Sequence, residues 1–209
     1  MRLTKRDEGL LWWANGMGYV TVAQVSAFMA TEFSTAARRV RILCGAGLLA
    51  RRPMPMSTAT VLIPTRDACA LIGDDLPPIA GVRIATARHD LALVDCAHAL
   101  QRKYRAAFEP ERRLRQRGFA IGDHLPDGIL NKDGAAAIAV ELELSQKAPA
   151  RLVEIFNRYA ANLDIDTVWY IVMSDAVERH VRRLAEGRSY VKIGRWRPNG
   201  ATSPSTVEE

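Results

Sequence analysis

The stretch of residues 125–145 constrains the fold more strongly than any other part of the chain. Two apolar, β-branched runs flank Asn131-Lys132-Asp133-Gly134, whose asparagine, aspartate and glycine are typical of a tight turn. The sequence therefore predicts a β-hairpin. Because side chains alternate along a strand, the second run has one apolar face and one face that carries Glu141 and Glu143.

Three carboxylates are predicted to gather on this hairpin. Glu141 and Glu143 project together, roughly 7 Å apart along the strand, and Asp127 can approach them from the partner strand. Like charges on a mostly apolar sheet repel, so we expect a cation among them, raised pKa values or an edge open to water. Mg²⁺ or Mn²⁺ would supply the cation. The alternative is the solvated outer face of an amphipathic strand.

Length and charge narrow the class of protein. A chain of 209 residues forms one large domain or two small ones. Its net charge of +6 favours a polyanionic partner. Three widely spaced cysteines indicate reduced thiols in a cytoplasmic protein. We see neither a signal peptide nor an apolar run long enough to span a membrane, so no membrane partner is expected.

The first part of the chain predicts three short helices followed by a hairpin. Thr4, Thr21 and Ser34 are suitable N-caps for these helices. The third helix is predicted over residues 35–44, with Ala37, Val40 and Cys44 facing inward. Residues 48–52 and 60–63 then form two strands, in the manner of a wing. At least one of the tryptophans at positions 12 and 13 is expected in the core.

A helix, a turn and a second helix with an arginine-rich free face are typical of a module that reads the major groove of DNA. Arginines at the base of the wing suit phosphate contacts, which set affinity and register. The residues predicted to bind double-stranded DNA are Ser34, Thr35, Arg38, Arg39, Arg41, Arg51 and Arg52. The alternative is that these arginines only solubilise a small helical domain.

We place a domain boundary after a short helix over residues 66–72. Residues 74–78 form a linker, which gives a winged helix-turn-helix domain over residues 1–78. A second domain covers residues 79–198, and residues 199–209 are expected to be a disordered tail.

The second domain is predicted to be α/β (α+β for the whole chain), with a mixed sheet flanked by helices on both faces. Its predicted elements are a helix over 86–104, weak extended runs over 108–114 and 119–121, the central hairpin, a helix from Pro149, a buried strand over 167–173, a helix capped by Asp175 and a strand over 189–196.

With Asp127 on one hairpin strand and Glu141 on the next, this domain resembles the PD-(D/E)XK nuclease superfamily, whose sheet is restriction-endonuclease-like. The chain as a whole resembles the replication-relaxation family of plasmids and integrative elements, in which a winged helix precedes such a sheet. The stretches that carry this resemblance are residues 34–39, 46–49, 89–91, 126–128, 141–143 and Tyr159.

The superfamily resemblance implies that Asp127 and Glu141 bind a metal ion. It also implies a lysine at position 143, where this chain has Glu143. The negative charge of a glutamate cannot stabilise the negatively charged phosphate during attack, as a lysine would. Lys147, at the start of the next helix, is a candidate substitute. The alternative role of Lys147 is an exposed lysine at a helix start.

Two functions follow from the resemblance. The first is a DNA-binding protein of a plasmid or other mobile element, in replication, mobilisation or transcription control, with a nuclease-like but non-catalytic second domain. Its implied partners are DNA, a second copy of the chain and other DNA-processing proteins of the element. The second is an endonuclease or nickase dependent on Mg²⁺ or Mn²⁺, with catalytic residues Asp127, Glu141, Glu143 and Lys147. The glutamate at position 143 favours the first.

Overall fold

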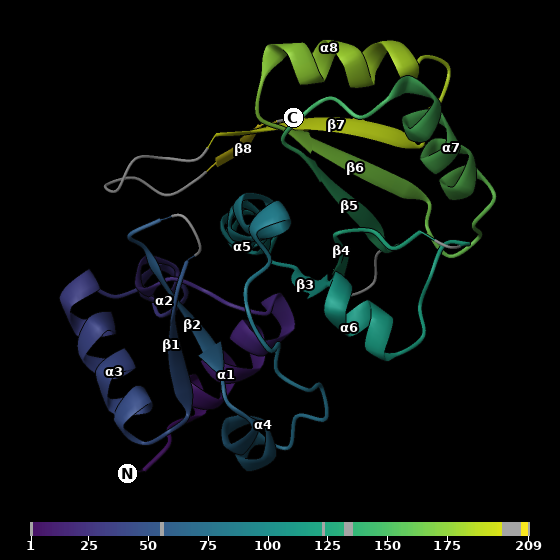
Figure 1. Cartoon of the computed structure of the whole chain (residues 1–209). Coiled ribbons are helices and arrows are strands. Elements are labelled where there is room, and N and C mark those ends of the chain that lie inside the picture. The colour runs from purple at the N-terminus through teal and green to yellow at the C-terminus, as the bar shows by residue number, and fades with distance from the viewer. Residues whose placement is uncertain (1, 55–56, 123, 132–135, 198–205, 209) are drawn as a thin grey trace. The chain divides into compact units, whose positions relative to one another are not determined.

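The computed structural model describes residues 2–54, 57–122, 124–131, 136–197 and 206–208. The chain divides into two compact units, Met1–Val94 and Asp95–Glu209 (Figure 1). The division lies within helix α5 (Ile84–Tyr104) and not at residue 78, where the sequence predicted it. Each unit is described by itself below.

The start of α5 belongs to the first unit because polar contacts bind it there. The hydroxyl of Tyr19 donates to Asp90 Oδ2 at 2.9 Å, and Gln24 Nε2 donates to the carbonyl oxygen of Leu91 at 2.9 Å. The segment predicted as a linker is also held, since Asn15 Nδ2 donates to Asp74 Oδ2 at 2.8 Å and to the Leu76 carbonyl at 2.7 Å. The sequence could not reveal these long-range bonds.

The first unit contains three helices, a hairpin and a fourth helix, as predicted. These elements are α1 (Lys5–Met17), α2 (Val22–Phe28), α3 (Phe33–Gly45), β1 (Leu49–Pro53), β2 (Thr60–Pro64) and α4 (Arg66–Ile72). Strands β1 and β2 pair in antiparallel fashion. The predicted N-caps Thr4 and Thr21 are confirmed, and each completes a capping box with the third residue of its helix.

The prediction for the start of α3 was wrong. The N-cap is Glu32, because the amides of Thr35 and Ala36 both donate to the Glu32 carbonyl at 3.0 Å, so Ser34 already lies within the helix. The inward stripe is therefore formed by Ala36, Val40 and Leu43 rather than by Ala37, Val40 and Cys44. As predicted, one tryptophan is core: Trp13 is buried and stacks on Phe28, whereas Trp12 is exposed.

The second unit contains a six-stranded mixed sheet in the order β3-β4-β5-β6-β7-β8. Strands β3, β4 and β5 are antiparallel neighbours, β5, β6 and β7 are parallel, and β8 is antiparallel to β7. The elements are β3 (Ala107–Pro110), α6 (Glu111–Gln116), β4 (Gly128–Asn131), β5 (Ile138–Glu143), α7 (Pro149–Ala160), β6 (Thr167–Val172), α8 (Asp175–Leu184), β7 (Val191–Arg197) and β8 (Thr206–Glu208).

The predicted hairpin is confirmed as β4 and β5, although residues 132–135 of its turn lie outside the described residues. Two other predictions were wrong. Residues 108–114 are not one extended run, because the chain turns into helix α6 at Glu111, and residues 119–121 contribute only an isolated bridge between Ile121 and His124. In the predicted tail, Thr206–Glu208 pairs with β7.

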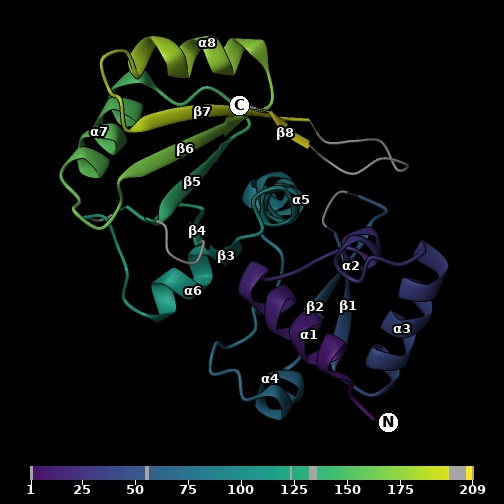
Figure 2. The same ribbon diagram turned by 180° about the vertical axis from the view of Figure 1, so that it is seen from behind.

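Helices cover both faces of the sheet, as predicted. Helices α7 and α8 lie on one face, and the part of α5 after Val94 lies on the other (Figures 1 and 2). Ring contacts confirm the two layers: Phe156 of α7 lies 5.2 Å from Tyr170 of β6, and Tyr104 of α5 lies 4.9 Å from Trp169 on the opposite face of that strand. In the described ranges, every helix is too short or too polar to cross a membrane.

Candidate functional site

The outward face of α3 is polar and cationic. Its inward stripe packs into the core of the first unit, which leaves Ser34, Thr35, Arg38 and Arg41 exposed on the other side. Helix α3 contains no aspartate or glutamate, so no carboxylate of this helix neutralises the two arginines. The structure thus brings together four of the five residues on α3 that the sequence predicted to contact DNA.

Arg39, the fifth, does not face outward. Its Nε donates to Asp7 Oδ1 at 2.7 Å and its NH2 contacts Asp7 Oδ2, which joins α3 to α1. The Asp7 side chain is fully buried, and it also accepts from the Thr4 amide at 2.8 Å. Burial raises the pKa of Asp7, but the bonds from Arg39 and Thr4 outweigh it and lower the pKa overall. Arg39 is therefore a structural residue, and its prediction as an outward residue was wrong.

The two arginines of the wing point to opposite faces of the hairpin. Arg51 lies opposite Leu62, and Arg52 lies opposite Val61. Leu62 packs into the core that α3 helps to form, whereas Val61 packs with Tyr19 on the other face. Because paired residues share a face, Arg51 lies on the same side of the hairpin as α3, and Arg52 does not. Both arginines are exposed.

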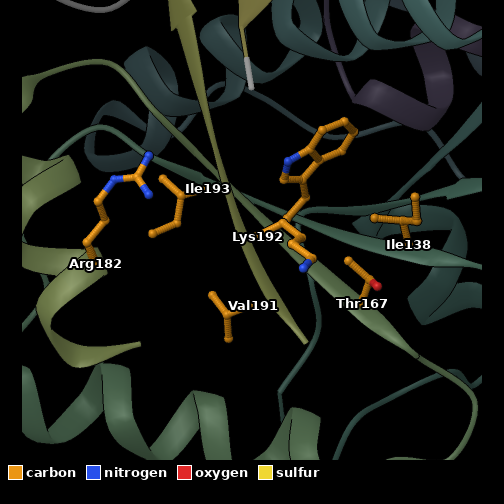
Figure 3. Close-up of a pocket in the computed structure, with 7 residues that line it drawn as sticks. Ile138, Thr167, Arg182, Val191, Lys192 and Ile193 are labelled. Carbon is orange, nitrogen blue, oxygen red and sulfur yellow. The ribbon is translucent and has the colours of Figure 1, made fainter. Parts of the chain in front are cut away.

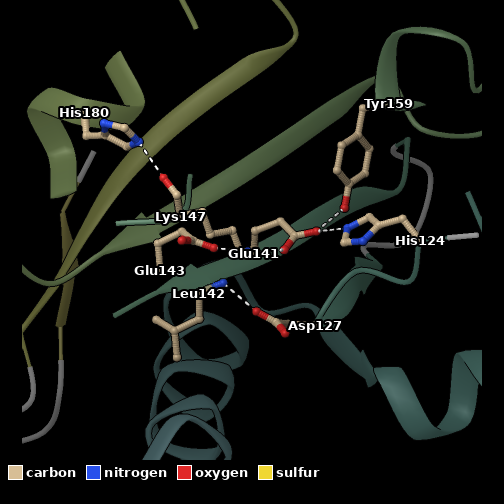
Figure 4. Close-up of polar contacts among 8 residues, drawn as sticks. All are labelled: His124, Asp127, Glu141, Leu142, Glu143, Lys147, Tyr159 and His180. Atoms are coloured by element: carbon tan, nitrogen blue, oxygen red, sulfur yellow. Dashed lines mark hydrogen bonds and ion pairs between the residues drawn. The ribbon is translucent and has the colours of Figure 1, made fainter. Parts of the chain in front are cut away.

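A second group of polar side chains, which we call the acid cluster, surrounds Glu141 and Glu143 on β5 (Figure 4). The strand directs both side chains toward the face that α7 and α8 cover. Their exposures are 2% and 3%, so the interpretation of this face as solvated was wrong. Two ionisable groups buried side by side must each find partners, since an unpaired buried charge is costly.

Glu141 receives two close contacts on one oxygen. The hydroxyl of Tyr159, on α7, donates to Glu141 Oε1 at 2.5 Å, and His124 Nε2 lies 2.6 Å from the same atom. His124 precedes β4, so the two partners come from opposite sides of Glu141 in the sequence. Burial, followed by the charge of Glu141, raises the pKa of Tyr159, and the phenol remains a proton donor to the carboxylate.

Lys147 brings a positive charge into the acid cluster. Its Nζ forms an ion pair with Glu143 Oε1 and lies 3.8 Å from Glu141 Oε2. His180 Nε2, on α8, contacts the carbonyl oxygen of Lys147 at 2.9 Å and fixes the backbone there. The side chain of Lys147 is 35% exposed, and its predicted alternative role as a merely exposed lysine was wrong.

The pKa values of Glu143 and Lys147 are both shifted by burial and by neighbouring charges. Burial raises the pKa of Glu143 to about 7, even though Lys147 opposes the rise and Glu141 adds to it. Burial alone would lower the pKa of Lys147, but Glu141 and Glu143 raise it. The lysine therefore stays charged at neutral pH, whereas Glu143 titrates near neutrality.

The carboxylate of Asp127 contacts the backbone of β5 between Glu141 and Glu143. Its Oδ2 accepts from the amide of Leu142 at 2.7 Å. The next residue is Gly128, and its lack of a side chain allows β3 to pack closely against β4. A Cβ at this position would lie 2.2 Å from the Phe108 ring and 2.8 Å from the Glu109 carbonyl oxygen. The Pro-Asp-Gly sequence thus combines a carboxylate at the start of β4 with a close strand contact.

Within the described ranges, no three histidine, cysteine, aspartate or glutamate side chains are positioned to hold one ion. The cation that lies among the carboxylates is the ammonium of Lys147. One polar atom nearby has no hydrogen-bond partner among the described residues, the buried phenol oxygen of Tyr170, which is paired in register with Glu141.

Sequence reasoning missed three residues of this cluster as functional candidates. The sequence singled out Tyr159 only for the family resemblance, and Tyr170 only as part of a buried strand. Neither signal tells which buried tyrosine contacts a carboxylate. His124 belongs to no recognisable motif. Only its proximity to Glu141, 17 residues away in sequence, identifies it.

A separate hollow of about 470 Å³ lies where β5, β6 and β7 begin (Figure 3). The residues that line it are Ile138, Thr167, Trp169, Arg182, Val191, Lys192 and Ile193. Two cationic side chains, Arg182 and Lys192, line this hollow. Arg182 already has a carboxylate partner, since its Nε donates to Glu178 Oε1 at 2.9 Å. None of the acid-cluster residues lines this hollow.

Comparison of the chain with protein-family models, with curated proteins and with solved structures found no match in any of the three.

Proposed function

We propose that this chain binds double-stranded DNA through α3 and the wing, as a DNA-binding protein of a plasmid or other mobile element. The observation that carries the proposal is the outward face of α3, where Arg38 and Arg41 are exposed beside Ser34 and Thr35 with no carboxylate on the helix. Arg51 adds a third exposed guanidinium on the same side of the hairpin.

The chemistry of this face suits duplex DNA. An α-helix fits the major groove, where guanidinium groups donate to guanine and hydroxyl groups serve as donors or acceptors. An arginine on an adjacent wing suits the phosphate backbone, which fixes register without reading sequence. The net charge of +6 favours approach to a polyanion.

The second unit serves, in this proposal, as a non-catalytic platform. The order of its helices and strands supports the resemblance to the PD-(D/E)XK nuclease superfamily. Its acid cluster, however, holds a lysine ammonium against Glu143 and near Glu141, and Asp127 is bonded to the backbone of Leu142. Internal charge balance of this kind supports a structural role for the acids.

The test of DNA binding uses fluorescence anisotropy with a labelled random-sequence duplex and a second duplex selected by the full chain. Arg38→Ala or Arg41→Ala should weaken binding to the selected duplex by about 1–3 kcal/mol. Arg66→Ala, an exposed arginine at the start of α4, is the matched control and should leave affinity unchanged. Equal affinities for wild type and both α3 variants would refute the proposed surface.

A homodimer is part of the proposal, because paired winged helices read two half-sites on duplex DNA. Light scattering coupled to size exclusion, with and without the selected duplex, measures the stoichiometry. A single copy of the chain on a single half-site, at every protein concentration, would argue against the dimer.

A metal-dependent endonuclease is the second candidate, and the position of Lys147 favours it. The resemblance implies a lysine beside the second acid, and the structure places Lys147 there from a different sequence position. Supercoiled plasmid incubated with Mg²⁺, Mn²⁺ or EDTA tests this candidate directly. Metal-dependent nicking that disappears in Asp127→Ala would establish it over the non-catalytic platform, and DNA binding without nicking would eliminate it.

A further inference from the structure

Ile42 is a large apolar side chain that is exposed on the outward face of α3, and Phe33, the first residue of the helix, is exposed as well. Ile42 is 42% exposed, and it follows Arg38 by one helical turn and Arg41 by one residue. Residues four apart on a helix are neighbours on its surface, so Ile42 continues the row that contains Ser34 and Arg38. Within the first unit this branched side chain is partly exposed to water. Contact with an apolar group would bury it and remove the unfavourable free energy of its hydration.

The major groove offers one apolar group on the edges of its bases, the 5-methyl group of thymine. Other base edges there present hydrogen-bond donors and acceptors, which an isoleucine cannot satisfy. Arginines at positions 38 and 41 flank Ile42 on the outward face, and they are the groups that would hold the helix against the duplex.

We propose that Ile42 determines specificity by contacting the 5-methyl group of a thymine in the bound DNA. This inference rests on the proposed DNA-binding function and adds a chemical class of base to it. Arg38 and Arg41 supply attraction and hydrogen bonding, and Ile42 supplies selection for a thymine at one position of each half-site. A base without the methyl group leaves part of the isoleucine surface in contact with water.

The test uses a duplex recovered by selection from a random library with the full chain. Each thymine of this duplex is replaced in turn by deoxyuridine, which lacks only the methyl group. We expect one position per half-site at which the replacement weakens wild-type binding by about fourfold, the equivalent of one buried methyl group. In Ile42→Ala this difference between thymine and uracil should disappear, while in Arg66→Ala it should remain.

Each outcome of the experiment is decisive. The inference is overturned if no thymine is sensitive to replacement, or if wild type and Ile42→Ala lose the same affinity at the same thymine. If either of these results is found and Arg38→Ala still weakens binding, the proposed DNA-binding function stands and only the role of Ile42 is refuted. If selection recovers no duplex, both fail. Unchanged thermal unfolding of Ile42→Ala confirms that the exposed substitution leaves the fold intact.

Discussion

The guanidinium of Arg39 and the carboxylate of Asp7 form an ion pair that ties α3 to α1. The carboxylate is fully buried, and two of its contacts come from the arginine while another comes from the Thr4 amide. The Asp7 carboxylate therefore completes the capping box of α1 and also holds α3 in place. Together with the buried stripe of Ala36, Val40 and Leu43, this pair is consistent with one orientation of α3, in which Arg38 and Arg41 face outward.

Arg39→Ala should lower the free energy of unfolding by about 3 kcal/mol, because it leaves the Asp7 charge buried without its partner. Arg38→Ala, one residue away but exposed, should change it by less than about 0.5 kcal/mol. Urea denaturation measures both. The double variant Asp7→Asn with Arg39→Ala should lose less than the sum of the two single losses. Strict additivity would contradict an energetic coupling between the two residues.

The two wing arginines provide a matched pair for DNA binding. Arg51→Ala should weaken binding to every duplex and reduce the salt dependence of log K by about 1, as expected when one phosphate contact is lost. Arg52→Ala should change neither quantity, because its strand position faces away from the side that carries α3. Anisotropy titrations at several salt concentrations compare them. Equal effects of both changes would contradict a binding surface on one side of the hairpin.

Lys147→Met should destabilise the second unit by about 2 kcal/mol at pH 8, because it leaves Glu141 and Glu143 buried without the ammonium. Methionine keeps the apolar stem, so the loss reports the charge. Adding Glu143→Gln should restore part of the stability. Mn²⁺ should raise the thermal midpoint of Lys147→Met more than that of wild type, because the carboxylates then lack a cation. If Mn²⁺ raised the thermal midpoints of both proteins equally, the metal ion would not be taking the place of the Lys147 ammonium.

Stability should fall as pH rises through neutrality because of Glu143. Its pKa is raised from 4.5 to about 7 in the folded chain, so between these values the folded state holds a proton that the unfolded state has released. The stabilisation is complete below pH 4.5 and is lost as pH rises through 7. Its full size is about 3 kcal/mol. Lys147 does not contribute in this window, because its raised pKa affects stability only above its usual value of 10.5.

Glu143→Gln removes the titrating group and should flatten this decline. Urea denaturation of both proteins at pH 5, 6, 7 and 8 gives the two curves. The difference between wild type and variant should change by about 2 kcal/mol across the series. Parallel curves would show that another group titrates, or that Glu143 ionises at its ordinary pKa.

Local patterns predicted most of the elements correctly. Threonine caps at positions 4 and 21, the apolar stripe of α7 and the apolar run of β6 are all signals within a few residues of each other. The errors came where local signals were weak or misleading. Ser34 resembles an N-cap but lies inside α3, and the mixed run from residue 108 contains both the end of β3 and the helix α6.

The sequence by itself determined that Glu141 and Glu143 share a face, since alternation along a strand is local geometry, and that a hairpin brings Asp127 beside them. It also determined that α3 carries arginines. Only the tertiary structure decided that Arg39 turns inward to Asp7, and that Lys147, Tyr159 and His124 surround the carboxylates. The reason is physical: a buried charge takes its partner from whichever element packs against it, and packing joins residues far apart in the chain.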